Sequence, residues 1–171
     1  MLEVRETSFA EVKIIVPEVF NDARGSFEEV FSRPKYAAIG ILDEFIQDNV
    51  SRSRKNVLRG MHYDLRMAKL VQTLHGAIYD VVVDMREDSK FYKKWFGCRL
   101  TAENHWQLYV PAGFAHGFVT LSDEALVMYK QSATYAPEQE RLLRWDDPTV
   151  AIEWPPGAAT AVLSAKDAAG P

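Results

Sequence analysis

Hydrophobic positions along the chain come in short runs rich in Val, Ile, Phe, Tyr and Trp, and residues that favour turns separate them. These runs lie at residues 11–20, 27–31, 44–53, 69–85, 95–101, 106–111, 116–121 and 125–135. Within 69–85 the apolar positions are almost continuous, as in strands that are covered on both faces. Many short strands at this spacing predict an all-β sandwich or barrel.

Turn-favouring residues predict how some of these strands connect. His75-Gly76 divides the long run at 69–85 into two strands, and Glu103-Asn104 lies between the next two runs along the chain. We expect a β-hairpin at each of these two places.

Only residues 34–45 have the pattern of a helix. Pro34 suits the first helical turn, and Ser32 precedes it. No linker, repeat or low-complexity segment appears before the small-residue tail at 165–171, so one domain covering residues 1–171 is expected.

The segment VLRGMHYDLRMAKL, residues 57–70, places charged and imidazole side chains in a strand-like run. Strict alternation would put Arg59 and His62 on opposite faces of the sheet. The two side chains can serve one site only if the strand bends. Gly60 lies between them and is the residue type found at bulges, so we expect the bend there.

Charge and cysteine content narrow the class of protein. Twenty Lys and Arg against 24 Asp and Glu give a formal net charge of −4, and no basic stripe stands out, so nucleic-acid binding is not expected. Cys98 is the only cysteine, which excludes an internal disulfide. The charged N-terminus lacks an apolar signal core, and no apolar run approaches the roughly 20 residues of a membrane span. A soluble cytoplasmic protein is expected.

The stretch VPAGFAHGFVTL, residues 110–121, contains the pattern P-x-G-x-x-H, which resembles the second conserved box of the cupin superfamily. That resemblance implies a double-sheet jelly roll, also called a double-stranded β-helix. Many cupins bind a metal, and His62, Asp64 and His116 are candidate ligands here. The first cupin box lacks its usual H-x-H spacing, however, and Lys69 brings an ammonium group, which cannot coordinate a metal while it is protonated.

Metal-free proton transfer is the alternative that these residue types favour. An imidazole can remove a proton next to a carbonyl, an ammonium group can stabilise the enolate oxygen, and a phenol can return a proton. Tyr129 is the candidate phenol, because it shares a strand face with Ala125 and Val127 and a buried hydroxyl needs a partner.

Several ordered motifs together resemble the dTDP-4-dehydrorhamnose 3,5-epimerase family, a family of metal-free, cofactor-free cupins. The resemblance runs from about residue 9 to the end of the chain. It implies an isomerase of deoxysugar biosynthesis that inverts C3 and C5 of a nucleoside-diphosphate-4-keto-6-deoxyhexose through enolate intermediates. The motifs are FNDARGSFEEVF, FIQDNVSRS, VLRGMHY, KLVQTLHGAIYDVVVDMREDS, LTAENHWQLYVPAGFAHGFVTLS, MYK, WDDPTVAIEWP and LSAKDAA.

The resemblance also assigns roles to four candidate catalytic residues. His62 matches the base, and Asp167 matches the carboxylate that orients it. Tyr129 matches the proton donor, and Lys69 matches the residue near the C4 oxygen.

For substrate binding, the resemblance assigns the diphosphate to Arg24 and Arg59, with His116 lining the same cavity. Phe27 and Tyr135 match the aromatic pair that stacks on the base. Members form homodimers in which an N-terminal strand joins the partner's sheet. Other matches to nucleotide-sugar contacts are Glu29, Gln47, Asn49, Glu140 and Lys166.

Two departures from the family pattern bear on specificity. The loop at 64–68 is shorter than usual, with Asp64 where Gln is common, and the chain ends soon after Asp167. Epimerisation at C3 or C5 alone, or on another nucleotide carrier, therefore stays open, as do a non-catalytic binding cupin and a metal-dependent one. His75 and His105 lie beside turns and are interpreted as structural.

Overall fold

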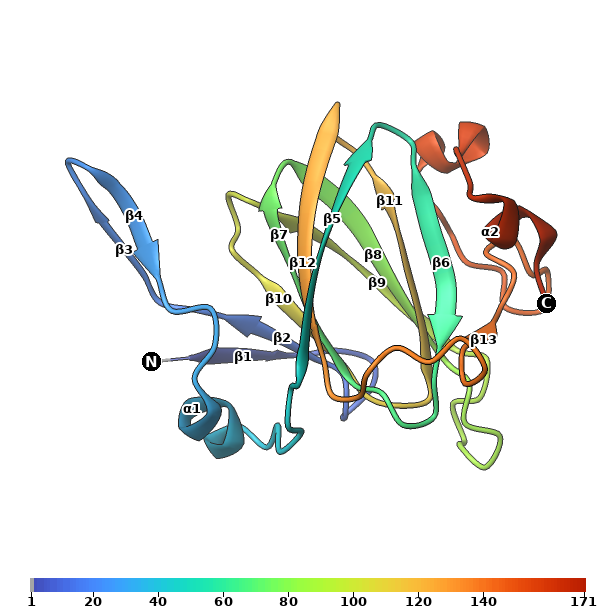
Figure 1. Ribbon diagram of the computed structural model, residues 1–171, viewed down its shortest axis with the longest axis horizontal. Helices are drawn as coiled ribbons and strands as arrows, with labels where there is room; N and C mark the ends of the chain where they lie inside the picture. The colour runs from blue at the N-terminus through green and yellow to red at the C-terminus, as the bar shows by residue number, and fades with distance from the viewer. Residues whose placement is uncertain (1) are drawn as a thin grey trace.

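Two antiparallel β-sheets packed face to face form the body of the protein in a computed structural model, which describes residues 2–171 (Figure 1). The larger sheet has the order β1 (Glu3–Glu6), β2 (Lys13–Val16), β10 (Gln107–Val110), β7 (Lys69–His75), β12 (Glu124–Gln131) and β5 (Gln47–Arg54). The smaller sheet has the order β13 (Arg141–Leu142), β6 (Leu58–Tyr63), β11 (Phe114–Thr120), β8 (Ala77–Asp84) and β9 (Trp95–Thr101). This architecture confirms the all-β jelly roll expected from the sequence.

The two expected hairpins are wrong. β7 and β8 lie in different sheets, and so do β9 and β10. Gly76 has a φ of 71° and turns the chain from one sheet into the other. Turn-forming residues mark where the chain reverses, but they do not determine which strand pairs with which, because a corner between sheets needs the same residue types.

The main core lies between the sheets, and further apolar clusters cover both outer faces. Val71 and Val127 from the larger sheet pack with Ile78 and Val82 from the smaller one. Outside the smaller sheet, residues 143–163 pack Leu, Val and Trp side chains on β6, β8 and β11. Strands covered on both faces explain the almost continuous apolar run at 69–85.

A short helix covers part of the outer face of the larger sheet. α1 (Arg33–Ala38) is half the length expected from the sequence, and Gly40, with a φ of 83°, follows it. Pro34 lies in its first turn, as expected, but the Ser32 side chain makes no capping bond. Buried Tyr36 anchors the helix, since its hydroxyl donates to the Gln107 Oε1 atom at 2.5 Å.

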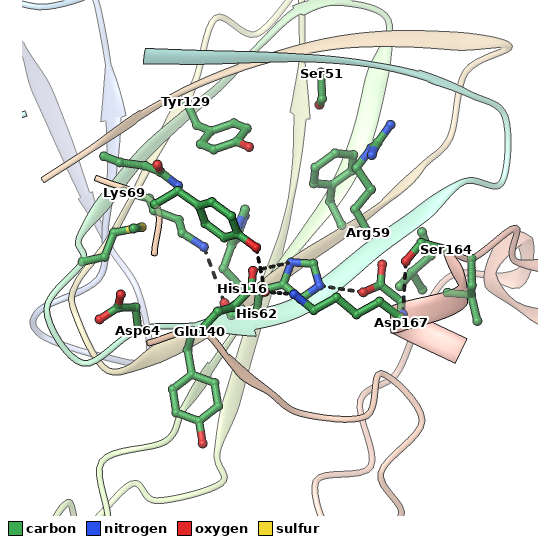
Figure 2. A pocket seen from close by; sticks show the side chains of 18 of the residues that line it. Ser51, Arg59, His62, Asp64, Lys69, His116, Tyr129, Glu140, Ser164 and Asp167 are labelled. Atoms are coloured by element: carbon green, nitrogen blue, oxygen red, sulfur yellow. Dashed lines mark hydrogen bonds and ion pairs between the residues drawn. The ribbon is translucent and has the colours of Figure 1, made fainter. Parts of the chain in front are cut away.

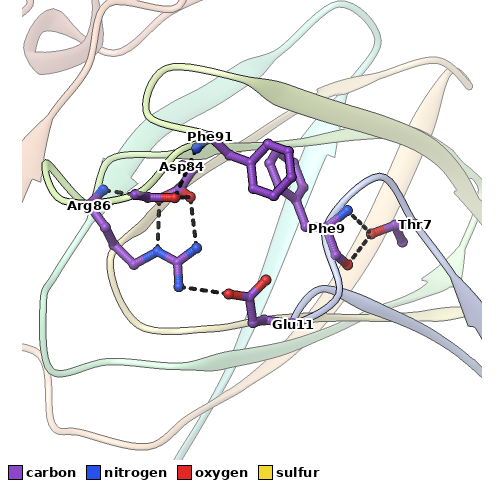
Figure 3. Close-up of polar contacts among 7 residues, drawn as sticks. Thr7, Phe9, Glu11, Asp84, Arg86 and Phe91 are labelled. Carbon is purple, nitrogen blue, oxygen red and sulfur yellow. Dashed lines mark hydrogen bonds and ion pairs between the residues drawn. The ribbon is translucent and has the colours of Figure 1, made fainter.

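The N-terminal segment contacts the barrel through an ion pair with Arg86 and through the ring of Phe9 (Figure 3). Arg86 donates two bonds to Asp84, at 2.9 and 2.7 Å, and one to Glu11 at 3.1 Å. Phe9 packs edge-on against Phe91 and Phe114 at ring-centroid distances of 5.6 and 5.3 Å. Burial would raise the pKa of Asp84, but bonds from Arg86 and Ser89 outweigh it and hold that pKa below its usual value.

A two-stranded hairpin projects away from the body of the molecule (Figure 1). It consists of β3 (Val19–Asp22) and β4 (Gly25–Glu28). Two aromatic side chains on it, Phe20 and Phe27, are 54% and 70% exposed. Exposed aromatic residues on a projecting element are typical of surfaces that contact another molecule.

The C-terminal segment folds back against β6. It contains a 3₁₀ helix, η1 (Pro156–Thr160), and α2 (Ala165–Ala169). Ser164 caps α2, because its Oγ atom accepts a bond from the Asp167 backbone N–H at 3.1 Å. No helix within residues 2–171 is long and apolar enough to cross a membrane.

Candidate active site

A pocket of about 420 Å³ lies between the two sheets, in the size range of small-molecule sites (Figure 2). Its walls come from β5, β6, β7, β11 and β12, together with the loop after β12 and the C-terminal segment. Nine of the side chains predicted from the sequence line this pocket: Arg59, His62, Lys69, His116, Tyr129, Tyr135, Glu140, Lys166 and Asp167.

The expected bend at Gly60 is present and brings two of these residues together. His62 pairs with His116 on β11, but Arg59 pairs with Phe118, so β6 has one extra residue in this stretch. Gly60 has a φ of 120°, and its peptide bond to Met61 is cis. The extra residue breaks the strict alternation, and Arg59 and His62 therefore both reach the pocket.

His62 and Asp167 form a short hydrogen bond, with 2.6 Å between Nε2 and Oδ1. The Asp167 side chain is buried and also accepts a bond from the Gly60 N–H at 3.4 Å. Because Asp167 accepts the Nε2 proton, Nδ1 is the basic nitrogen, and it lies 3.7 Å from Glu140 Oε1. Burial lowers the pKa of His62, and Asp167 only partly offsets this, so the ring is neutral and able to accept a proton near pH 7.

Tyr129 lies on the opposite sheet from His62. Its hydroxyl has no hydrogen-bond partner among residues 2–171. Burial raises the pKa of Tyr129, with Arg59 acting weakly in the other direction, and the phenol is therefore protonated at neutral pH.

Lys69 begins β7 and reaches across to β6, where its Nζ donates to the His62 carbonyl at 3.5 Å. Burial lowers the pKa of Lys69 to about 8, although the carboxylates of Asp80 and Asp64 favour its charged form. The side chain thus carries a positive charge at neutral pH and loses it in mildly basic solution.

His116 is held by the carboxylate of Asp80, a residue that the sequence motifs do not assign to the site. Asp80, which is fully buried on β8, contacts His116 Nε2 with both oxygens at 2.9 and 3.0 Å. The sequence does contain one indication of this contact, because Asp80 lies within the apolar run at 69–85. A carboxylate in a buried strand requires a polar partner.

Arg59 is fixed at the pocket by two hydrogen bonds. Its Nε donates to Ser53 Oγ at 2.9 Å, and its Nη2 donates to the Arg52 carbonyl at 3.3 Å. A guanidinium group oriented in this way presents its remaining N–H groups in a plane, which suits phosphate oxygens.

Glu140, Lys166 and Tyr135 form a polar rim beside His62. Glu140 forms an ion pair with Lys166 and accepts a weak bond from the Tyr135 hydroxyl at 3.5 Å. The Tyr135 ring is half exposed, and its backbone N–H donates to Gln47 Oε1 at 3.0 Å.

Five residues predicted for the site do not line this pocket. Arg24 and Phe27 lie on the projecting hairpin, where Arg24 pairs with Asp22 at 2.6 Å. Glu29 pairs with Lys35 at 2.9 Å. The remaining two, Gln47 and Asn49, are joined by a 3.0 Å bond on β5.

The candidate metal ligands are engaged elsewhere. His62 and His116 each bind a different aspartate, and Asp64 accepts two bonds from the Arg66 side chain at 3.0 and 2.6 Å. Within residues 2–171, no group of three or more His, Cys, Asp or Glu side chains is placed to hold a metal ion.

Known proteins resemble this chain along almost its whole length. The family model described as dTDP-4-dehydrorhamnose 3,5-epimerase matches residues 6–171. The chain is 44% identical over 175 residues to the dTDP-4-dehydrorhamnose 3,5-epimerase of Salmonella typhimurium, covering 100% of this chain and 95% of that protein. It is 45% identical over 172 residues to the Neisseria gonorrhoeae enzyme of the same name, covering 99% of this chain and 52% of that longer protein.

Among solved structures, the dTDP-6-deoxy-D-glucose-3,5-epimerase of Legionella pneumophila, in complex with dTDP-4-keto-L-rhamnose, superimposes with a TM-score of 0.96 at 43% identity. The match covers 99% of this chain and 92% of that one. Sequence and fold agree over almost the whole length, and the chain therefore belongs to the dTDP-4-dehydrorhamnose 3,5-epimerase family.

Proposed function

We propose that this protein inverts C3 and C5 of a dTDP-4-keto-6-deoxyhexose by removing and returning protons through enolate intermediates. One observation carries the proposal: a neutral His62 bound to Asp167 and a protonated Tyr129 line one pocket from opposite sheets. Inversion at a carbon requires a proton to leave one face of the planar enolate and another to arrive at the opposite face. A base and an acid on facing walls meet that requirement.

In the proposed reaction, His62 Nδ1 takes the proton from the carbon next to the carbonyl, and Asp167 stabilises the resulting imidazolium. The Lys69 ammonium stabilises the negative charge on the C4 oxygen, a contribution worth about 3 kcal/mol for one well-placed donor. Tyr129 then gives its proton to the carbon from the other side. The imidazolium of His62 then releases its extra proton to water, and the tyrosinate of Tyr129 takes up a proton from water, so both groups are ready for the next inversion.

The rest of the pocket supports binding of the nucleoside diphosphate. Arg59 and His116 would bind the diphosphate. Arg59 provides a guanidinium group that is fixed by a hydrogen bond, and His116 provides an imidazole that is held by a carboxylate. Tyr135 at the rim provides an exposed ring on which the base can stack. Glu140 and Lys166 lie beside it and can bond the sugar or nucleoside hydroxyl groups.

The protein acts as a homodimer in this proposal. Arg24 and Phe27 cannot reach the pocket of their own chain from the projecting hairpin, yet they are the kind of residues that hold phosphate and base (Figure 1). A second copy would allow the hairpin to cover the partner's pocket and would bury Phe20 and Phe27, which are exposed in one chain.

Deuterium incorporation tests the function directly. The dTDP-4-keto-6-deoxyhexose is incubated with the enzyme in D₂O, and NMR counts the deuterated carbons. Exchange at both C3 and C5 with inversion is expected; exchange at a single carbon would identify a mono-epimerase instead. His62→Ala should abolish exchange, whereas Tyr129→Phe should allow exchange without inversion at one carbon or both. Normal exchange by His62→Ala would overturn the assignment of the base, and the same substrate on CDP and GDP carriers tests the nucleotide.

A further inference from the structure

Gln131, the last residue of β12, carries a side-chain amide that has no hydrogen-bond partner in the described part of the chain, residues 2–171. It lies two residues after Tyr129, on the same strand face, and it lines the pocket. The residue is 6% exposed, and its Oε1 atom is buried without a hydrogen-bond partner. Neither polar atom of this amide bonds to any residue within 2–171.

Other buried glutamines of the same sheet are paired. On the outer face, the Gln107 amide donates to the Val30 carbonyl at 2.8 Å and to Gln72 Oε1 at 2.9 Å. The Gln72 amide in turn donates to Glu28 at 3.2 Å. Most buried polar atoms in native proteins have partners, and leaving one unpaired is costly. Gln131 lines the pocket, so a bound molecule is the partner that remains available to its amide.

The position of Gln131 indicates which part of the substrate it meets. In the sheet it lies directly opposite Lys69, and side chains paired in this way on one face lie within reach of each other. In the proposed function, Lys69 contacts the C4 oxygen. The amide beside it therefore faces a substituent on the neighbouring ring carbon.

The chemistry of an amide selects a hydroxyl for this contact. The amide offers both a donor and an acceptor, whereas the keto oxygen and the diphosphate can only accept. A hydroxyl both donates and accepts, so it satisfies either end of the amide. We propose, on the basis of the proposed function, that Gln131 binds the C3 hydroxyl and makes the enzyme select 4-keto sugars that carry it.

A site built to bond a hydroxyl rejects an analogue that lacks it, because the protein group is then buried unpaired. The test compares dTDP-4-keto-6-deoxyhexose with its 3-deoxy analogue. The readout is the rate of deuterium incorporation at C5, which needs no hydroxyl at C3. The wild-type kcat/KM should favour the hydroxylated substrate by about 10- to 100-fold.

Gln131→Met keeps the length of the side chain and removes its polar atoms, and it should reduce that preference to about threefold or less. Gln131→Leu serves the same purpose if the Met variant does not fold. Gln72→Met, on the opposite face of the same sheet, is the control and should keep the wild-type ratio. An unchanged preference in the Gln131 variants, or a wild-type enzyme that does not discriminate, would overturn the inference. Absence of exchange with either substrate in the wild type would overturn the proposed function and, with it, this inference.

Discussion

Gly60 on β6 and Gly117 on β11 are in such close contact that neither has room for a side chain. A Cβ atom on Gly60 would lie 2.6 Å from the Gly117 Cα, and one on Gly117 would lie 3.2 Å from the Gly60 Cα. This close approach accompanies the bulge that turns Arg59 and His62 into one pocket. The geometry of the site therefore depends on two residues that have no chemistry of their own.

Gly60→Ala should lower the free energy of unfolding by about 2–4 kcal/mol, since the new methyl group combines a left-handed φ with a backbone clash. Gly40→Ala is the matched control, because its φ of 83° is strained but nothing lies within 4 Å of the added atom. Urea unfolding of both variants separates the two effects. Equal losses of stability would mean that the contact with Gly117 is unimportant.

Removing the Asp167 carboxylate should weaken His62 as a base. Asp167→Asn is expected to lower kcat by about 10²- to 10⁴-fold while the fold is retained. Because Asp167 raises the pKa of His62 against the effect of burial, its loss should move the acidic limb of the kcat/KM profile to lower pH. The pH profile therefore separates this role from a purely structural one, which would leave the limb in place.

Loss of activity in basic solution should follow the deprotonation of Lys69. In the proposed function its charged form stabilises the enolate, and a pKa of about 8 therefore predicts that kcat/KM falls as the pH rises through that value. Tyr129 titrates higher, since burial raises its pKa above the usual value near 10. Lys69→Arg keeps the charge and should remove the decline near pH 8. Asp64→Asn should move the decline to lower pH, because the Asp64 carboxylate favours the protonated amine.

The pair formed by Arg86 and the buried Asp84 predicts a stability effect that depends on pH. Arg86→Met leaves a fully buried carboxylate without its main partner and should cost about 2–3 kcal/mol near pH 7. The folded-state pKa of Asp84 is depressed, so the pair contributes fully above its unfolded value of about 3.9. This contribution disappears as the pH falls through the folded-state pKa.

Urea midpoints of the wild type and Arg86→Met should therefore converge in acid. Arg144→Met, which breaks an exposed pair with Asp146, is the control and should change stability little at any pH. A difference between wild type and Arg86→Met that persists at low pH would point to lost packing on Phe114 instead of lost charge pairing.

Local patterns in the sequence predict the strands and the bend at Gly60. They do not predict which strands, distant along the chain, pair with each other. A turn at His75-Gly76 looks the same whether the next strand pairs beside it or crosses to the other sheet. Asp167 sits 105 residues from His62, and only the family resemblance placed the two together. Gln131 carried no signal at all, because an amide at the end of a strand is ordinary until the pocket around it is known.

Arg24 and Phe27 illustrate a second limit of prediction from sequence. A motif does not tell whether a residue contacts the pocket of its own chain or that of a second copy. If the hairpin completes the partner's pocket, a variant lacking both side chains, Arg24→Ala with Phe27→Ala, should be inactive alone. His62→Ala should also be inactive alone. In mixed dimers, the intact hairpin of the His62 variant would meet the intact pocket of the hairpin variant.

Random mixing makes half of the dimers mixed, and each of these holds one complete pocket of two, so activity should recover to about a quarter of the wild-type value. Mixing His62→Ala with Tyr129→Phe is the control. Both changes lie in the same pocket, so no mixed dimer contains an intact site, and activity should stay low. Mixed dimers of the first pair that form but show no activity would mean that the hairpin acts on its own chain or has no role in the site. Recovery in the first mixture alone requires a pocket built from two copies, because only then can each variant supply what the other lacks.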